Sequence, residues 1–320
     1  MININVNDFN SVSETCDGFF RIRKNCVDKI LQSKDRKIYI IMFDNRKILI
    51  GVNTQNSYVS YYPFQKPNIE YPIKAVLMDL DGTTLYSEKF WIHVIEKTIG
   101  FLSNNTEFSA KEEDIPFISG HSVSEHLIYC IEKYCPSCSL NDAMNIYHEV
   151  SHRELETLMN GESKDLNIQP AFYLKEFLFE LIGKGIKIGL VTSGLYEKAY
   201  PEINNICLSL DMEKPEKIYN SIITAGSPLK DHSVGTLGEL SCKPHPWLYL
   251  ENAIVGLGIP FSERNHVIGI EDSGAGICSL CTAGIPAIAV KDGNVIKSGL
   301  SSLCTDICDN LLEIKEKYFS

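Results

Sequence analysis

The sequence predicts an α/β protein in which a parallel β-sheet is covered by helices on both faces. From Lys74 onward, short apolar runs alternate with helical stretches, which is the pattern of successive strand and helix units. Polar or Gly-rich turns bound each run, and carboxylates stand at the ends of several of them. In such folds the chemistry gathers at the carboxyl ends of the strands. The expected strands are AVLMDL, IKIGLVTS, NSIITAG, HVIGIED and AIAVKD.

Residues 1–70 differ in texture and are predicted to form a small α+β appendage. We expect a helix from Gly18 to Gln32, and then a β-hairpin in which Asp44, Asn45 and Arg46 join KIYIIMF to KILIGV. The stretch PFQKPNIEYP carries three prolines and no periodicity, which is typical of a linker. We therefore place a domain boundary there.

The long segment between the first and second expected strands is predicted to be helical throughout. Apolar residues recur at three- and four-residue spacing in EKFWIHVIEKTIGFL, SVSEHLIYCIEKY, NDAMNIYHEVSHRELETLM and PAFYLKEFLFELIGK. A helical block inserted after the first strand would lie over the strand ends as a cap. We assign residues 87–185 to this cap, and 71–86 with 186–320 to a catalytic core.

The composition excludes several classes of partner. The net charge is -11, which repels nucleic acids and anionic membranes at long range. The start of the chain lacks the features of a signal peptide, and no apolar run approaches the length of a membrane span. We expect a cytoplasmic protein that binds neither nucleic acid nor membrane.

The 11 cysteines fit reduced thiols better than a disulfide framework, because the chain is long and the count is odd. Two close pairs, Cys135 with Cys138 and Cys278 with Cys281, could in principle form a four-thiolate zinc site. The second pair lies on an Ala-rich, core-facing helix, where small buried thiols behave as apolar side chains. Packing is therefore the preferred explanation of both pairs.

The strongest chemical signal is DLDGTT, which follows the apolar run AVLM directly. Asp79 and Asp81, two positions apart at a strand end, can both face one crevice if the chain turns at Gly82. One carboxylate could attack phosphorus while the other moves protons. Two close anions also favour a hard cation such as Mg²⁺. The alternative is a turn that carries two solvated acids.

Three later segments supply what a phosphorylated carboxylate needs. Thr192 and Ser193 end the run KIGLVTS and could donate to phosphate oxygens, although such residues also cap helices. Lys243 lies in CKPHP, where the prolines fix the backbone, although it could be a surface lysine in a loop. Glu271 and Asp272 end HVIGIED and could complete a Mg²⁺ site.

In this order, each at a strand end, the four segments resemble the motifs of the haloacid dehalogenase superfamily. The matching stretches are DLDGT, LVTS, KPHP and EDSGAG, and the resemblance covers roughly residues 73–292. It implies a doubly wound, Rossmann-like core with a helical cap, and a Mg²⁺-dependent phosphate-ester hydrolase. The implied roles are Asp79 as nucleophile, Asp81 as general acid and base, Thr192, Ser193 and Lys243 on the phosphoryl group, and Asp79, Asp81, Glu271 and Asp272 at the metal.

The cap resembles the branch that contains phosphoglycolate phosphatase and β-phosphoglucomutase. Gly120 and His121 match the position of a cap loop that meets the substrate there, although His121 could simply begin a helix. Mutases of this branch carry a hinge histidine where this chain has Trp91, and a Lys-Asn pair where it has Leu195-Tyr196. Both departures argue against a mutase.

The sequence thus predicts a Mg²⁺-dependent phosphatase that hydrolyses a small phosphorylated metabolite through an aspartyl phosphate. A phosphosugar mutase, which passes the phosphoryl group back to a hydroxyl, is the alternative enzyme. A non-catalytic binding or regulatory protein that keeps the same fold is the alternative of another class.

Overall fold

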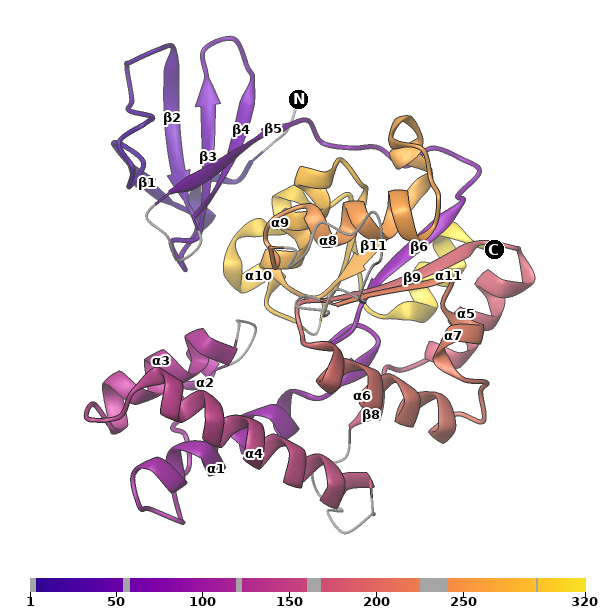
Figure 1. Ribbon diagram of the computed structural model, residues 1–320. Helices are drawn as coiled ribbons and strands as arrows, with labels where there is room; N and C mark the ends of the chain where they lie inside the picture. Colours follow the sequence, from indigo (N-terminus) through magenta and orange to yellow (C-terminus); the bar gives the residue numbers. More distant parts are fainter. Residues whose placement is uncertain (1–3, 54–57, 119–122, 160–167, 225–240, 292) are drawn as a thin grey trace, which may run out of the picture.

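The computed structural model describes residues 4–53, 58–118, 123–159, 168–224, 241–291 and 293–320. An N-terminal antiparallel sheet, a central α/β core and a helical cap can be followed in Figure 1 by their colours from indigo through magenta to yellow. The N-terminal sheet and the cap both lie on one side of the core. The predicted fold class, a doubly wound α/β core with an inserted helical cap and an N-terminal appendage, is confirmed.

In the described chain the core sheet has six parallel strands in the order β10-β9-β6-β11-β12-β13. Their bounds are Ser221–Thr224 (β10), Lys187–Thr192 (β9), Ala75–Asp79 (β6), Val267–Glu271 (β11), Ala287–Val290 (β12) and Asp306–Cys308 (β13). All the strands expected from the apolar runs are present. Strand β13 was not predicted, because three residues carry too short an apolar run to stand out.

Strand β6 shows why the sheet is covered on both faces. All of its residues are buried, and alternate side chains enter different hydrophobic clusters: Val76 and Met78 join one, and Ala75 and Leu77 the other. A strand buried on both faces is typical of parallel sheets between helical layers. Because the chain leaves β6 toward β9 and later returns beside it as β11, the strand order reverses at β6, where ligands bind in such folds.

Two helical layers sandwich this sheet. Buried residues of one layer belong to the cluster that contains Val76, and those of the other to the cluster that contains Leu77. The first layer comprises α5 (Leu174–Gly183), α6 (Tyr196–Ser209), α7 (Pro215–Ile218) and α11 (Leu311–Tyr318). The second comprises α8 (Trp247–Leu250) with a π-helical turn (Glu251–Gly256), α9 (Gly274–Ala283), α10 (Val295–Ser298) and the 3₁₀ helix Leu300–Leu303, while another 3₁₀ helix, Phe261–His266, precedes β11.

The cap consists of α1 (Glu88–Leu102), α2 (Ile115–Ile118), α3 (Val123–Tyr134) and α4 (Leu140–Met159). Helix α1 packs against α3 and α4. The two connections to the core pair with each other as a short antiparallel ribbon of β7 (Leu85–Tyr86) and β8 (Gln169–Pro170). Helix α5, which we had included in the cap, packs against β9 and α11 of the core. We therefore propose that the cap ends before α5.

The N-terminal unit is an antiparallel sheet in the order β1-β2-β3-β4-β5. Its strands are Asn10–Val12 (β1), Val27–Gln32 (β2), Ile38–Phe43 (β3), Ile48–Asn53 (β4) and Val59–Phe64 (β5), preceded by the 3₁₀ helix Val6–Asp8. The predicted hairpin is present as β3 and β4. The predicted helix from Gly18 to Gln32 is wrong, because Arg23, Asn25 and Cys26 have positive φ angles and the following residues pair with β3. That tertiary pairing overrides the helical spacing of the apolar residues.

The N-terminal sheet shares a hydrophobic core with the second helical layer, the one that contains α9. Ile40 and Ile50 of the sheet belong to the same buried cluster as Ile277 and Cys278 of α9. Polar contacts add to this interface: Lys66 Nζ donates to the carbonyl of Ser302 at 3.3 Å. Since apolar burial is the dominant stabilising term in folding, these contacts hold the N-terminal appendage against the core.

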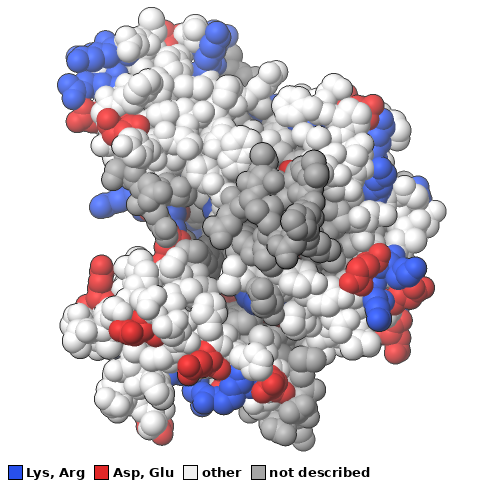
Figure 2. Space-filling view, viewed as in Figure 1, with Lys and Arg blue, Asp and Glu red and all other residues white. Residues whose placement is uncertain are grey.

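The sheet also reaches the cap. Lys37, in the connection between β2 and β3, lies 2.8 Å from Glu125 of α3. Figure 2 shows an indentation between the N-terminal unit at the upper left and the cap at the lower left, with acidic and basic side chains on both.

None of the helices in the described ranges has both the length and the apolar character that a membrane crossing requires.

Candidate active site

The carboxyl ends of three neighbouring strands bring the predicted residues together. Asp79 ends β6, Thr192 ends β9 and Glu271 ends β11. Lys243, from the loop before α8, reaches into the same place: its Nζ forms an ion pair with Oδ1 of Asp79 and lies 2.6 Å from Oε1 of Glu271. The four sequence motifs therefore meet at one edge of the sheet, as predicted for residues at the ends of parallel strands.

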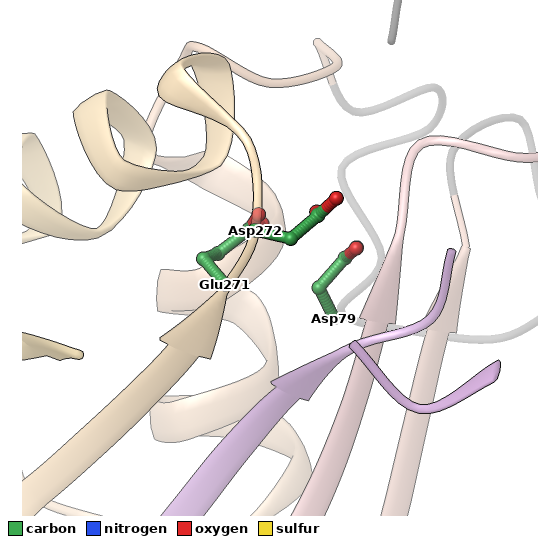
Figure 3. A group of neighbouring side chains, drawn as sticks. All are labelled: Asp79, Glu271 and Asp272. Carbon is green, nitrogen blue, oxygen red and sulfur yellow. The ribbon is translucent and has the colours of Figure 1, made fainter. Parts of the chain in front are cut away.

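Three carboxylates form a compact acidic group. Asp79, Glu271 and Asp272 each offer an oxygen, and these oxygens lie within 4.8 Å of one another. In Figure 3, Asp79 rises from the end of β6, and Glu271 and Asp272 stand at the end of β11 beside it. If all three acids were ionised, their charges against the single ammonium of Lys243 would leave an excess of two negative charges at a largely buried site.

The close approach of these carboxylates changes the pKa values of Asp79 and Asp272. Burial, and then the neighbouring Glu271, raise the pKa of Asp79 to about 8 despite the opposing effect of Lys243. Burial and the same carboxylates raise the pKa of Asp272 well above its ordinary value. A divalent cation would balance the excess charge, and oxygen-only ligands suit Mg²⁺. The donor set therefore fits a magnesium ion.

Glu271 differs from the other two acids because donors of the protein surround it. Oε1 accepts from Lys243 Nζ and from the hydroxyl of Tyr249, at 2.6 and 2.5 Å. Oε2 accepts from the backbone N–H and the hydroxyl of Ser273, at 3.2 and 3.0 Å. The side chain is fully buried. Glu271 thus holds Lys243 in place, and would reach a metal only by exchanging one of these partners.

Asp272 is close to the turn that follows Asp79. A Cβ added at Gly82, whose φ is +84°, would lie 2.2 Å from Oδ2 of Asp272. Only glycine allows both this backbone conformation and this approach. The glycine of the DLDGT motif therefore makes room for the second acid of the group.

Asp81 lies outside the group of three. Its side chain is 37% exposed, and its carboxylate accepts from the hydroxyl of Ser87 and lies 3.3 Å from Nζ of Lys198. Ser87 is the N-cap residue of α1, yet it makes no side-chain cap hydrogen bond. Its hydroxyl instead donates a hydrogen bond to Asp81, at the point where the chain enters the cap.

The hydroxyl residues at the end of β9 shape the neighbouring loops. Thr192 is 2% exposed, and its Oγ1 accepts from the N–H of Gly194 at 2.9 Å. Ser193 is exposed, and its Oγ accepts from the N–H of Lys243 at 3.3 Å.

Burial alone would lower the pKa of Lys243, but Asp79 and Glu271 raise it above its ordinary value. The ammonium group therefore stays charged.

Sequence reasoning missed Lys198, Glu202 and Tyr249. Lys198 and Glu202 lie one turn apart on α6, and Tyr249 donates to Glu271. A lysine and a glutamate four residues apart in a helix that must bury one face could have signalled the first two. The predicted cap residues Gly120 and His121 lie outside the described residues.

Fold and site together define a class of protein. A parallel sheet covered by helices, a helical insertion after its first strand, and a buried carboxylate beside a fixed lysine at the strand ends are features of α/β enzymes.

Comparison with known proteins agrees with this class. Residues 76–219 match the model of the haloacid dehalogenase-like hydrolase family. This match agrees with the resemblance that the four motifs carry. Among the curated proteins, no sequence relative of the chain was found.

Solved structures share the fold at low sequence identity. One is CbbY from Rhodobacter sphaeroides in complex with phosphate, with 17% identity, a TM-score of 0.55, and coverage of 76% of this chain and 96% of that one. Another is described as a predicted phosphoglycolate phosphatase from Haemophilus somnus, with 15% identity, a TM-score of 0.58, and coverage of 76% and 97%. A third is β-phosphoglucomutase from Clostridium difficile, with 20% identity, a TM-score of 0.53, and coverage of 77% and 97%.

Proposed function

We propose that the protein is a Mg²⁺-dependent phosphatase that hydrolyses a small phosphorylated metabolite through an aspartyl phosphate on Asp79. One observation carries the proposal: Lys243 is fixed against Asp79 inside a group of three carboxylates, of which Asp79 and Glu271 are buried. A carboxylate so placed at a strand end, with one oxygen held by a lysine, has its other oxygen available for attack.

In the first half of the reaction, a carboxylate oxygen of Asp79 forms a bond to phosphorus while the bond from phosphorus to the ester oxygen breaks. The electron pair goes to the ester oxygen, which takes a proton from Asp81. Lys243 and the hydroxyl of Ser193 would meet the phosphoryl oxygens. Asp79 and Asp272, with Glu271 behind them, would hold Mg²⁺, which when bound supplies positive charge to the phosphoryl oxygens.

In the second half, water attacks the phosphorus of the aspartyl phosphate and gives its proton to Asp81. The bond between phosphorus and Asp79 breaks, and inorganic phosphate leaves. Asp81 must be accessible to the ester oxygen in the first half and to water in the second, which agrees with its partial exposure and its place outside the acidic group. Thr192, whose hydroxyl binds within its own turn, would keep the strand end in shape.

The ligands of a similar solved structure support a small phosphorylated substrate. CbbY from Rhodobacter sphaeroides has been solved with phosphate, and its D10N mutant with xylulose-(1,5)bisphosphate. These ligands favour a phosphorylated sugar among the candidates for this chain.

A mutase is less well supported than a phosphatase. Trp91 stands where mutases carry a hinge histidine, and its Nε1 donates to Glu202. His93, two positions further on, lies 3.3 Å from Glu154 of α4, inside the cap. Trp91 has no imidazole, and that of His93 lies against Glu154. We therefore prefer water as the acceptor of the phosphoryl group.

The test is phosphate release from p-nitrophenyl phosphate with and without Mg²⁺. Wild-type protein should release phosphate only with the ion, and Asp79→Asn should abolish the activity while retaining the fold. Asp28→Asn, an exposed aspartate of β2, serves as the matched control and should be as active as wild type. Full activity of Asp79→Asn would contradict the nucleophile, and formation of an isomeric sugar phosphate without free phosphate would favour the mutase.

A further inference from the structure

A second set of buried charges lies beside Asp81, on the first turns of α6. Lys198 Nζ is 3.3 Å from Oδ2 and 3.5 Å from Oδ1 of Asp81. The same ammonium lies over the ring of Trp91, 4.2 Å from its centroid. The Lys198 side chain is 21% exposed. A lysine so enclosed keeps one position, because a carboxylate and an aromatic face both attract it.

Glu202, one turn further along α6, binds the indole of Trp91 on which Lys198 lies. It is 1% exposed, and its Oε1 accepts from Nε1 of Trp91 at 2.6 Å. Its second oxygen has no hydrogen-bond partner among the described residues. Burying a carboxylate with incomplete hydrogen bonding is costly, and such groups are concentrated at functional sites. Here Glu202 orients the indole whose face then receives Lys198.

The contacts form a continuous series from Glu202 through Trp91 and Lys198 to Asp81. Two of these residues are on α6 of the core, and Trp91 is in the first turn of cap helix α1. The ring of Tyr147 of α4 lies beside the indole, with centroids 6.4 Å apart and planes tilted by 34°. The ammonium of Lys198 is thus placed by the core and the cap together, close to where the chain crosses between them.

We infer that Lys198 is a positioning residue that orients the Asp81 carboxylate, and that Trp91 and Glu202 fix Lys198 for this task. The inference rests on the proposed role of Asp81 as general acid and base. Asp81 has two donors, the Ser87 hydroxyl and the Lys198 ammonium. Without Lys198 the carboxylate could turn away from the ester oxygen, so proton transfer to the leaving group would suffer.

Leaving-group dependence separates this role from a purely structural one. A nitrophenolate leaves without a proton, whereas a phenolate of higher basicity depends on the general acid. Lys198→Met should therefore lower kcat for phenyl phosphate by about 10- to 100-fold, and kcat for p-nitrophenyl phosphate by no more than a few-fold. Lys198→Arg, which keeps the charge, should recover most of the loss.

Lys175→Met is the matched control. Lys175 is a partly buried lysine whose Nζ donates to the carbonyl of Leu210, at the opposite end of α6. It should leave both substrates unaffected. Equal losses of Lys198→Met on the two phosphates, or no loss on either, would overturn the inference. Trp91→Phe removes the N–H that binds Glu202 and should show a weaker form of the same substrate-dependent loss.

A second measurement separates failure of this inference from failure of the proposed function. Inactive wild-type protein would reject the phosphatase, and the contact can then be judged from the urea unfolding of Lys198→Met, Asp81→Asn and the double variant. If Lys198 holds Asp81, the midpoint of the double variant should shift by less than the sum of the single shifts. Additive shifts would overturn the placement of Lys198, whatever the activity.

Discussion

The phenol oxygen of Tyr62 lies 2.8 Å from Nδ1 of His245, so the N-terminal sheet touches the loop that carries the active-site lysine. His245 stands two residues after Lys243 and is 7% exposed. Its carbonyl accepts from the hydroxyl of Ser279 at 2.5 Å, and burial lowers the pKa of its imidazole. The loop is therefore held between the N-terminal sheet on one side and α9 on the other.

Tyr62→Phe should loosen this loop. Loss of one largely buried hydrogen bond costs about 1 kcal/mol of unfolding free energy. Because Lys243 depends on the same loop, phosphate release should also fall severalfold. Tyr58→Phe, which alters an 80% exposed tyrosine of the same unit, should change neither. Thermal unfolding and the phosphatase assay measure the two effects, and unchanged activity of Tyr62→Phe would show that the N-terminal sheet does not support Lys243.

The sequence predicted those parts of the molecule that local pattern determines. Strands such as β6 are apolar throughout, and helices such as α1 keep one apolar spacing from end to end, so both can be recognised without a structure. Three of the four motifs lie at strand ends, where the convergence of parallel strands brings Asp79 and Asp272 together, and the loop before α8 adds Lys243.

What the sequence did not reveal depends on contacts between distant segments. Strand β2 has the apolar spacing of a helix and becomes a strand because it pairs with β3. Lys198 meets Asp81 across 117 positions, and Trp91 meets Glu202 across 111. The first pair depends on the packing of α6 against the turn after β6, and the second on the packing of the cap against the core. The periodicity of a single sequence carries no signal of either contact.

Glu271 and Asp272 should respond differently to loss of charge. Asp272→Asn should weaken Mg²⁺ affinity by about 10- to 100-fold with a small effect on stability. Glu271→Gln disturbs a fully buried acceptor of Lys243, Tyr249 and Ser273, so it should cost about 3 kcal/mol of stability. Its effect on Mg²⁺ affinity should be the smaller of the two.

Calorimetric titration with Mg²⁺ and thermal unfolding measure these two quantities. Glu180→Gln, in an exposed ion pair with Lys184 on α5, is the matched control and should affect neither. If Glu271→Gln abolished ion binding while stability remained intact, Glu271 would be a metal ligand and not the support of Lys243.

Gly276→Ala should damage the site even though alanine favours helices. A glycine within a helix costs about 1 kcal/mol relative to alanine, so the change would ordinarily stabilise α9. At this position, however, the new Cβ would lie 1.8 Å from Oε1 of Glu271, a carboxylate fixed by its donors. We expect a lower melting temperature and loss of most of the phosphatase activity. Gly183→Ala in α5, where nothing lies within 4 Å of the added Cβ, should leave both unchanged or raise stability, and equal behaviour of the two variants would refute the clash.

Asp114 is expected to be the main polar support of the cap. Its side chain is fully buried and accepts from Tyr129, Lys133 and Tyr134 of α3, at 2.7, 2.6 and 2.5 Å. Burial raises the pKa of Asp114, but these hydrogen bonds, with Lys133 foremost, outweigh it and hold the pKa well below the ordinary value of 3.8. Asp114→Asn should cost about 2 to 3 kcal/mol at pH 7, because donors to a buried charge lose their acceptor.

The pH dependence of that loss follows from the direction of the shift. A carboxyl group whose pKa is lowered by folding contributes its full stability above the unfolded value of 3.8 and loses it as the pH falls toward the folded value. The difference in melting temperature between wild type and Asp114→Asn should therefore be constant from pH 7 to pH 5 and shrink near pH 3. Glu113→Gln, which alters the neighbouring exposed partner of Lys133, should have little effect at either end. A difference that stayed the same at pH 3 would mean that the ionised form of Asp114 is not what stabilises α3.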